Sequence, residues 1–336
     1  MSTTWLTEDE KREVLECIQQ GKPLDEKYRF KLFGDKKQVE LVWNGKRDIH
    51  TMNTVLPFQY IEHIDEPRTD VGKSEVGLFD TSGRQAAGWT NKLIWGDNKL
   101  VLSSLVQGPM RDEIEKNGGI KLIYIDPPFD VGANFTTKVK VGDEEVVKEA
   151  SGLEELAYRD TWGRGADSFI AMLYERLVLM RDLLADDGSI YVHCDWRVNS
   201  YIRLILDEVF GKENFRNQVA WCYRGGGNEK NNYKNKHDTI LFYTKGTRNI
   251  FNWKDISIAY KEIPITASWR NNTREEAMKI AKKKMEEGMV PYDWWDDIPA
   301  FSTATRSKER LDYPTQKPEK LLERIIKASS NENDIV

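Results

Sequence analysis

The quartet Asp126-Pro127-Pro128-Phe129 combines an acceptor, a rigid turn and an aromatic ring directly after the apolar run KLIYI. An exocyclic amine on a nucleobase is a poor nucleophile, because its lone pair is conjugated into the ring. Two acceptors that face its two hydrogens draw the nitrogen toward tetrahedral geometry, and the Asp126 carboxylate and the Pro127 carbonyl suit this task. Pro128 lacks an N–H and keeps the turn extended, while Phe129 offers a face on which an extruded base can stack. The quartet therefore indicates a site that activates a base amine.

The same quartet is also compatible with a turn that merely ends a strand. Its position after a predicted buried strand favours the functional interpretation, because ligands of open α/β sheets bind beyond the carboxyl ends of strands. The trio His193-Cys194-Asp195 has residue types typical of a nucleophile or metal site. Neighbouring strand residues point to opposite faces, so we interpret these three as structural.

Strands that alternate with helices must position these residues. The predicted strands are NKLIWGD, KLIYID, SIYVHCD, QVAWCYR and TILFYTK, and the predicted helices include NKLVLSSLVQG, YIRLILDEVF and PEKLLERIIKASS. This alternation predicts an α/β fold with a doubly wound, mostly parallel sheet. The charged residues 136–160 predict a surface insertion, and NENDIV begins what we expect to be a further core strand.

Composition changes divide the chain into four predicted parts. We expect an N-terminal arm with a small β unit at residues 1–88 and a catalytic core at residues 89–224. A recognition insert follows at residues 225–312, and residues 313–336 form a final helix and the start of the next core strand. In the arm, Thr7 and Glu10 predict a capping box for a helix that ends at Gly21. In the insert, Trp294-Trp295 is interpreted as packing between insert and core rather than as a wedge for a duplex.

Length and composition exclude several classes of protein. The 336 residues are 39% hydrophobic and 11% aromatic, which excludes a disordered chain. The sequence contains no run of about 18 apolar residues that would span a membrane, and its start lacks the pattern of a secretory signal. Cys17, Cys194 and Cys222 form no CxxC pair, so neither a disulfide framework nor a zinc site is expected, and a reducing cytoplasm fits.

The charge distribution points to a polyanionic partner. The net charge is −5, yet residues 221–254 carry seven Lys and Arg against two acidic residues. Lysines in this region suit phosphates, and asparagine can pair with the edge of adenine. The predicted DNA-binding residues are Arg224, Lys230, Asn232, Lys234 and Lys236. A solvated loop without a ligand is the alternative.

The segment IDPPFDVGANF resembles the catalytic motif of amino-group DNA methyltransferases that use S-adenosylmethionine, and the similarity extends over most of residues 90–336. The order of catalytic motif, insert and cofactor motif resembles the β class, which includes type III modification subunits and stand-alone enzymes. Asp-Pro-Pro-aromatic implies methylation of adenine N6 in double-stranded DNA after base flipping, with cytosine N4 as the alternative. The resemblance also implies a restriction-modification setting, with a restriction subunit or a second copy as partners.

The resemblance implies two cofactor contacts. Asp97 in NKLIWGDNKLVLSSL corresponds to a position near the adenine of S-adenosylmethionine, although it would equally serve as a helix N-cap. Thr315, Gln316 and Lys317 correspond to the helix start beside the methionine end, where backbone N–H groups favour an anion. An ordinary helix start is the alternative for Lys317.

One departure from the family concerns the end of the chain. In this family the next strand leads into an Asp-Pro-Phe-x-Gly-x-Gly loop that holds the cofactor, whereas this sequence ends at Val336 within that strand. We therefore expect a C-terminally truncated enzyme that is inactive alone. A short form that binds DNA or a partner subunit without catalysis is the alternative from another class.

Overall fold

A computed structural model describes residues 7–20, 28, 41–43, 46, 55–59, 61, 91–127, 137–141, 144–148, 166–225, 230–260, 273–301, 307–311 and 316–336. The chain forms two compact units, Met1–Val42 and Trp43–Val336. In the first unit, α1 spans Glu8–Gln19, and the predicted capping box between Thr7 and Glu10 is confirmed. The helix is capped at Gln20, one residue before the predicted Gly21. The division into four parts stays a prediction.

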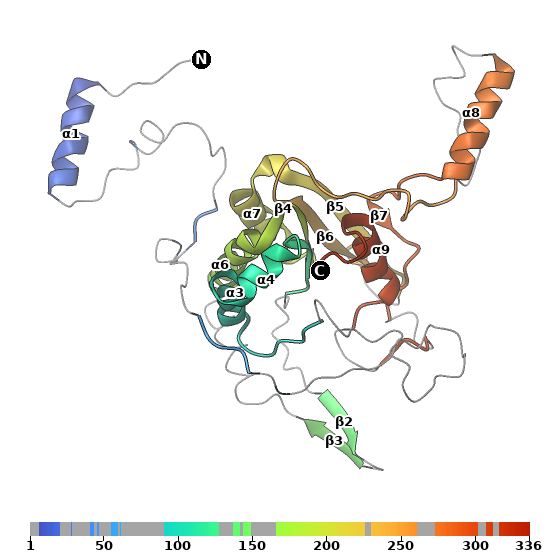
Figure 1. The fold of residues 1–336 in the computed structure, drawn as a ribbon, viewed down its shortest axis with the longest axis horizontal. Coiled ribbons are helices and arrows are strands. Elements are labelled where there is room, and N and C mark those ends of the chain that lie inside the picture. The colour runs from blue at the N-terminus through green and yellow to red at the C-terminus, as the bar shows by residue number, and fades with distance from the viewer. Residues whose placement is uncertain are drawn as a thin grey trace. The chain divides into compact units, whose positions relative to one another are not determined.

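A five-stranded sheet forms the centre of the second unit (Figure 1). Its order is β1 (Ile120–Ile125), β4 (Leu184–Cys194), β6 (His237–Thr244), β5 (Phe215–Cys222) and β7 (Trp294–Trp295). The pairs β1–β4 and β5–β7 are parallel, whereas β6 is antiparallel to both of its neighbours. Four strands of this sheet therefore run in one direction, which confirms the mostly parallel α/β prediction. At the other edge of β1, Ile335 forms a parallel bridge with Ile120, as expected for the start of a strand.

Helices cover both faces of this sheet (Figure 1). Helices α3 (Asn98–Gln107), α4 (Met110–Lys116), α6 (Ala166–Leu183) and α7 (Asn199–Phe210) lie on one side, and α9 (Glu319–Ser329) lies on the other. A short 3₁₀ helix, Lys212–Asn214, follows α7, and α8 spans Arg274–Glu287. None of the helices in the described ranges is long and apolar enough to cross a membrane.

Two stretches differ from expectation or add to it. The predicted buried strand NKLIWGD is wrong, because residues 91–97 form no strand and the side chains of Leu93 and Trp95 are exposed. A strand exists only through hydrogen bonds to a neighbour, and no described strand pairs with this run. The predicted surface insertion contains an antiparallel pair, β2 (Thr137–Val141) and β3 (Glu144–Lys148).

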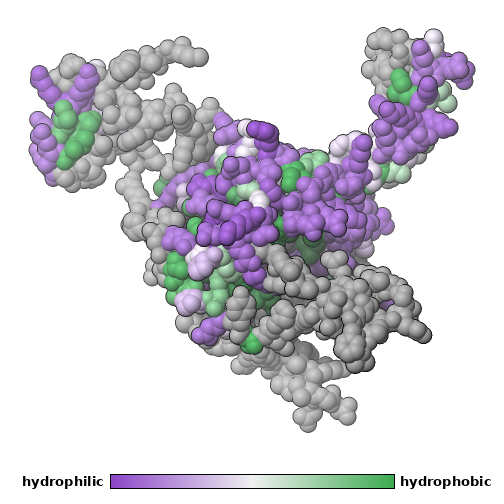
Figure 2. Space-filling model, viewed as in Figure 1, coloured by the Kyte–Doolittle hydropathy of each residue, from purple (hydrophilic) through white to green (hydrophobic). Residues whose placement is uncertain are grey.

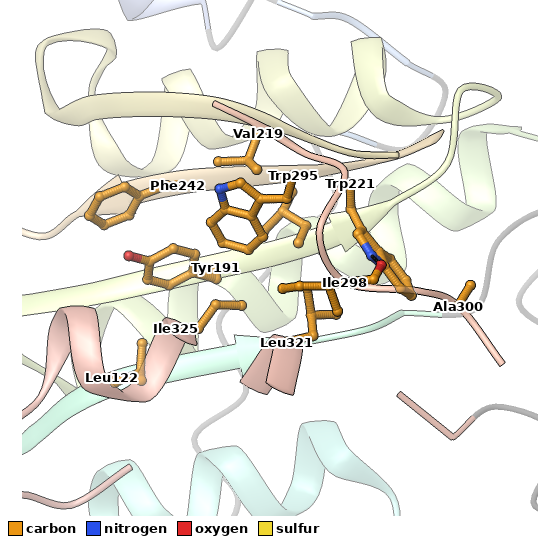
Figure 3. Close-up of a cluster of buried hydrophobic side chains, with 11 residues drawn as sticks. Leu122, Tyr191, Val219, Trp221, Phe242, Trp295, Ile298, Ala300, Leu321 and Ile325 are labelled. Carbon is orange, nitrogen blue, oxygen red and sulfur yellow. Dashed lines mark hydrogen bonds between the residues drawn. The ribbon is translucent and has the colours of Figure 1, made fainter. Parts of the chain in front are cut away.

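The sheet face under α9 carries the larger hydrophobic cluster shown in Figure 3. Leu321 and Ile325 of α9 pack against side chains that alternate along the strands, because every second residue of a strand points to the same face. The strand residues of this cluster are Leu122, Tyr191, Val219, Trp221, Ile240 and Phe242. The Arg324 guanidinium lies over the Trp295 ring and hydrogen-bonds to Asp297, and these hydrogen bonds lower the pKa of Asp297.

Ile325→Ala is expected to reduce the free energy of unfolding by about 2–5 kcal/mol, because the side chain is fully buried in this cluster. The neighbouring Ile326 is 43% exposed on the same helix, so Ile326→Ala should cost less than about 1 kcal/mol. Urea unfolding followed by circular dichroism measures both variants. Equal losses would contradict the orientation of α9.

Candidate active site

Asp126 and Lys317, predicted separately from two motifs, meet at the carboxyl end of β1. The Lys317 ammonium donates a hydrogen bond to Oδ2 of Asp126, across 191 positions of sequence. The two side chains are 24% and 17% exposed, so the pair is open to a ligand. Among the described residues, Lys317 is the hydrogen-bond partner of this carboxylate, which leaves Oδ1 available as an acceptor. Pro127 is half-buried, and Pro128, Phe129 and Thr315 lie outside the described residues.

A fully buried histidine lies behind the Asp126 carboxylate. The register Ile125–Val192 continues to Asp126 and His193, so the two side chains project from the same face of the sheet. Nδ1 of His193 is 3.7 Å from Oδ1 of Asp126 and 2.9 Å from the Tyr124 hydroxyl oxygen. Nε2 of His193 is 3.2 Å from Oδ2 of Asp238. The sequence interpretation of His193 as purely structural did not include these contacts.

The polar chain continues across the sheet to β5. The Tyr223 hydroxyl donates to Oδ1 of Asp238 over 3.0 Å. Burial raises the pKa of Tyr124 and of Tyr223, and the nearby carboxylates raise both further: Asp126 and Asp238 act on Tyr124, and Asp238 acts on Tyr223. Both phenols therefore keep their protons and serve as hydrogen-bond donors.

The partners of His193 fix where its hydrogen lies. An ionised carboxylate only accepts hydrogen bonds, so the contact with Asp238 requires a hydrogen on Nε2 of His193. Nδ1 then accepts a hydrogen bond from the hydroxyl of Tyr124, a phenol that keeps its proton. The ring therefore presents no N–H to the Asp126 carboxylate.

The basic loop that was predicted to bind DNA connects β5 to β6. Strand β5 has the same direction as β1, and β6 is antiparallel to β5. The loop that joins them therefore lies at the carboxyl end of β1, where Asp126 is. The side chains of Arg224, Lys230, Asn232 and Lys234 are exposed, and Lys236 is half-buried. The Lys236 carbonyl accepts a hydrogen bond from the Tyr223 N–H, so the loop is anchored at the end of β5. Hydrophilic residues dominate the described surface in Figure 2.

The remaining predicted cofactor residues have structural contacts of their own. Asp97 is the N-cap of α3, where its carboxylate accepts from the N–H groups of Lys99 and Leu100 at 2.9 and 3.2 Å. Both side-chain groups of Gln316 hydrogen-bond to the backbone of the segment that precedes α9, at Leu311 and Glu309. No hydrogen bond or ion pair in the described part of the chain joins Asp97 to Asp126 or Lys317.

Other candidates from the sequence are separated by the fold. Cys194 is buried and Asp195 hydrogen-bonds to Arg197 at 2.7 Å, so the trio with His193 forms no common site. Trp295 is buried in the cluster under α9, which confirms the packing interpretation, whereas Trp294 is half-exposed and stacks on Tyr292. In the described part of the chain, no cluster of three His, Cys, Asp or Glu residues could hold a metal ion.

Sequence reasoning missed Tyr124, Asp238 and Tyr223. One available signal was period-two spacing, since Tyr124 lies two residues before Asp126 and Tyr223 two residues after Trp221. The contact between these strands required the strand order, which the sequence does not contain.

Comparison with known proteins identifies relatives of this chain. A family profile described as DNA methylase matches residues 120–336. The type II methyltransferase M.EcaI of Enterobacter cloacae is 35% identical over 164 residues, which are 48% of this chain and 31% of that protein. The Mod subunit of the type III restriction-modification enzyme EcoP15I of Escherichia coli is 29% identical, over 48% of this chain and 25% of that subunit. The DNA adenine methyltransferase YhdJ of Escherichia coli is 27% identical, over 69% of each chain.

The match therefore spans less than a third of M.EcaI and a quarter of the EcoP15I subunit.

The buried Cys194 thiol is expected to resist alkylation. Burial, and then the charge of Asp195, raises the pKa of this thiol, so little thiolate exists near neutral pH. The Cys222 thiol is only partly buried and should react first with iodoacetamide in the folded protein. Mass spectrometry of the alkylated peptides measures both rates. Faster labelling of Cys194 would restore the trio as a candidate nucleophile.

Proposed function

Because the chain belongs to the DNA methylase family, we propose that it moves a methyl group from S-adenosylmethionine to the N6 amine of adenine in double-stranded DNA. The position of Asp126 carries this proposal. Its carboxylate lies at the carboxyl end of β1, beside the start of α9, with Oδ1 open and Oδ2 bound by Lys317. The relative YhdJ, an adenine methyltransferase, supports adenine as the target base.

The proposed chemistry requires no proton to leave before attack. Oδ1 of Asp126 and the Pro127 carbonyl accept the two hydrogens of the flipped adenine amine, which draws the nitrogen toward tetrahedral geometry and frees its lone pair. Phe129 stacks on the base and Pro128 shapes the turn. Bound S-adenosylmethionine supplies an electrophilic methyl group. With the cofactor held by Lys317 and the start of α9, its methyl carbon would pass to the amine nitrogen, its sulfur would leave as a neutral thioether, and the proton released from the methylated amine would pass to Oδ1 of Asp126 or to water.

The residues around the start of α9 fit the carboxylate of this cofactor. The backbone N–H of Glu319, in the first turn of α9, donates to the Glu309 carboxylate, so this helix end already holds a carboxylate. Lys317 adds a cation at the same place. We propose that Lys317 and the helix start bind the methionine end, with Thr315 and Gln316 shaping the preceding turn. Asp97 would face the adenosine end while it caps α3.

DNA binding is proposed for the β5–β6 loop. Its cations are exposed at the sheet end that carries Asp126, where they can meet phosphates on either side of a flipped base. The relative EcoP15I Mod is a subunit of a restriction-modification enzyme. This supports a restriction subunit as a partner of the present protein. We also propose a second copy of the chain as a partner, and action in the cytoplasm, where the DNA lies.

Asp126→Ala is expected to lower the single-turnover rate of methyl transfer by at least about 10²-fold, because one of the two acceptors for the amine is lost. The dissociation constant for DNA should stay nearly unchanged. A filter assay with methyl-labelled cofactor and a fluorescence titration with duplex DNA measure the two quantities.

Asp186→Ala provides the matched control, since this exposed carboxylate lies near the amino end of β4, far along the strand from the site. It should transfer methyl groups at the wild-type rate. Wild-type turnover by Asp126→Ala would exclude the proposed role.

Lys230→Gln and Lys234→Gln should each weaken DNA binding and reduce the slope of log K against log salt concentration by about 0.9, if each lysine neutralises one phosphate. Lys116→Gln is the control, because this exposed lysine ends α4 ahead of β1, at the opposite end of the sheet. Titrations at several salt concentrations give the slopes. Unchanged slopes in both loop variants would remove the loop from the DNA interface.

A further inference from the structure

Strands β1, β4 and β6 each place one polar side chain behind Asp126, and the residue after β5 adds a fourth. Together these form what we name the support network: Tyr124, His193, Asp238 and Tyr223. We propose that the support network locks His193 in the tautomer that leaves Oδ1 of Asp126 open to the target amine. The inference rests on the proposed function, because it assigns positioning residues to the same carboxylate.

The network lies next to the hydrophobic cluster under α9 that Figure 3 shows, and Tyr124 and Tyr223 pack against that cluster. Side chains two positions away from the network point to the same face and belong to this cluster. They are Leu122, Tyr191 and Trp221, which precede Tyr124, His193 and Tyr223, and Ile240, which follows Asp238. At the end nearest Asp126 the polar side chains of this face are hydrogen-bonded to one another, whereas at the opposite end Ser189 and Thr244 are buried apart from this network. Burying polar groups costs free energy unless they are hydrogen-bonded, and the hydrogen bonds that join Tyr124, His193, Asp238 and Tyr223 offset this cost.

The His193 ring is held by packing as well as by hydrogen bonds. Its side chain is 0% exposed, and the Trp221 ring contacts it edge-on with centroids 5.6 Å apart. The Tyr124 ring is tilted against it at 6.3 Å. A ring held in this way cannot turn to exchange its two nitrogens without displacing neighbours.

The chemical effect follows from which nitrogen faces Asp126. With the hydrogen on Nε2 directed to Asp238, Nδ1 accepts from Tyr124 and has no hydrogen to offer Oδ1 at 3.7 Å. The opposite tautomer would place an N–H next to Oδ1 and compete with the substrate amine for that acceptor. Asp238 therefore affects Oδ1 of Asp126 indirectly, by setting the tautomer of His193. The hydrogen bond from Tyr223 orients the Asp238 carboxylate.

Asp238→Asn and Tyr124→Phe test the proposal, because each removes one restraint on the tautomer. An asparagine amide can donate to Nε2 and favour the hydrogen on Nδ1. Both variants are expected to lower the single-turnover rate at saturating DNA and cofactor by about 10- to 100-fold, with both dissociation constants unchanged.

Two matched controls remove equivalent groups elsewhere. Tyr191→Phe deletes a buried hydroxyl of the same face, whose partner is Ser329 at 2.7 Å. Asp207→Asn alters a carboxylate of α7 that accepts a hydrogen bond from the Tyr243 hydroxyl at 2.6 Å. Both controls should retain the wild-type rate. Equal losses in the controls, or wild-type rates in Asp238→Asn and Tyr124→Phe, would overturn the proposal.

The tautomer of His193 can also be measured directly, first in the native protein and then in a variant. Imidazole ¹⁵N NMR should show His193 with its hydrogen on Nε2, and Asp238→Asn should move it to Nδ1. A hydrogen on Nδ1 in the native protein would overturn the proposal. If Asp126→Ala keeps its activity, the proposed function fails as well. If Asp126→Ala is inactive while Asp238→Asn and Tyr124→Phe are fully active, only the support network is excluded.

Discussion

The alternation of side chains along β1, β4, β5 and β6 is the constraint on which the whole site depends. In register, these strands place their alternate residues on one face, where α9 covers an apolar cluster. At the carboxyl end of the same face several residues are polar, and the side chains of Asp126 and Asp238 are partly exposed there. Because α9 is fixed by Leu321 and Ile325, the residue just ahead of it, Lys317, reaches Asp126. The packing of the core therefore sets the positions of the residues that form the site.

The electrostatic balance at this end of the sheet suits a ligand that replaces existing contacts. A partly exposed ion pair such as Lys317–Asp126 contributes at most about 1 kcal/mol, so a ligand carboxylate can compete for the lysine at small cost. The groups behind Asp126 behave differently. His193 is fully buried and hydrogen-bonded to Tyr124, so these two side chains have little freedom to rearrange. The Asp126 carboxylate therefore has a replaceable contact, Lys317, on one side and fixed groups on the other.

The sequence predicted the parts of the site that belong to local motifs. Asp126 follows an apolar strand and Lys317 precedes an amphipathic helix, and both features are readable over about ten residues. The strand NKLIWGD was wrong because pairing depends on a neighbour that local composition does not reveal. The support network comes from three strands and the residue after a fourth, and tertiary packing sets the order and register of these strands. Alternation correctly separated His193 from Cys194, but it could not tell which of the two faced Asp126.

The chemical identity of the methylated base tests the central claim most directly. The native protein is incubated with duplex DNA and S-adenosylmethionine that carries a labelled methyl group, and the DNA is then digested to nucleosides for mass spectrometry. The account predicts label in N6-methyladenine. Label in N4-methylcytosine would contradict adenine as the target. DNA without label, from a protein that binds both the cofactor and the duplex, would contradict methyl transfer by this site.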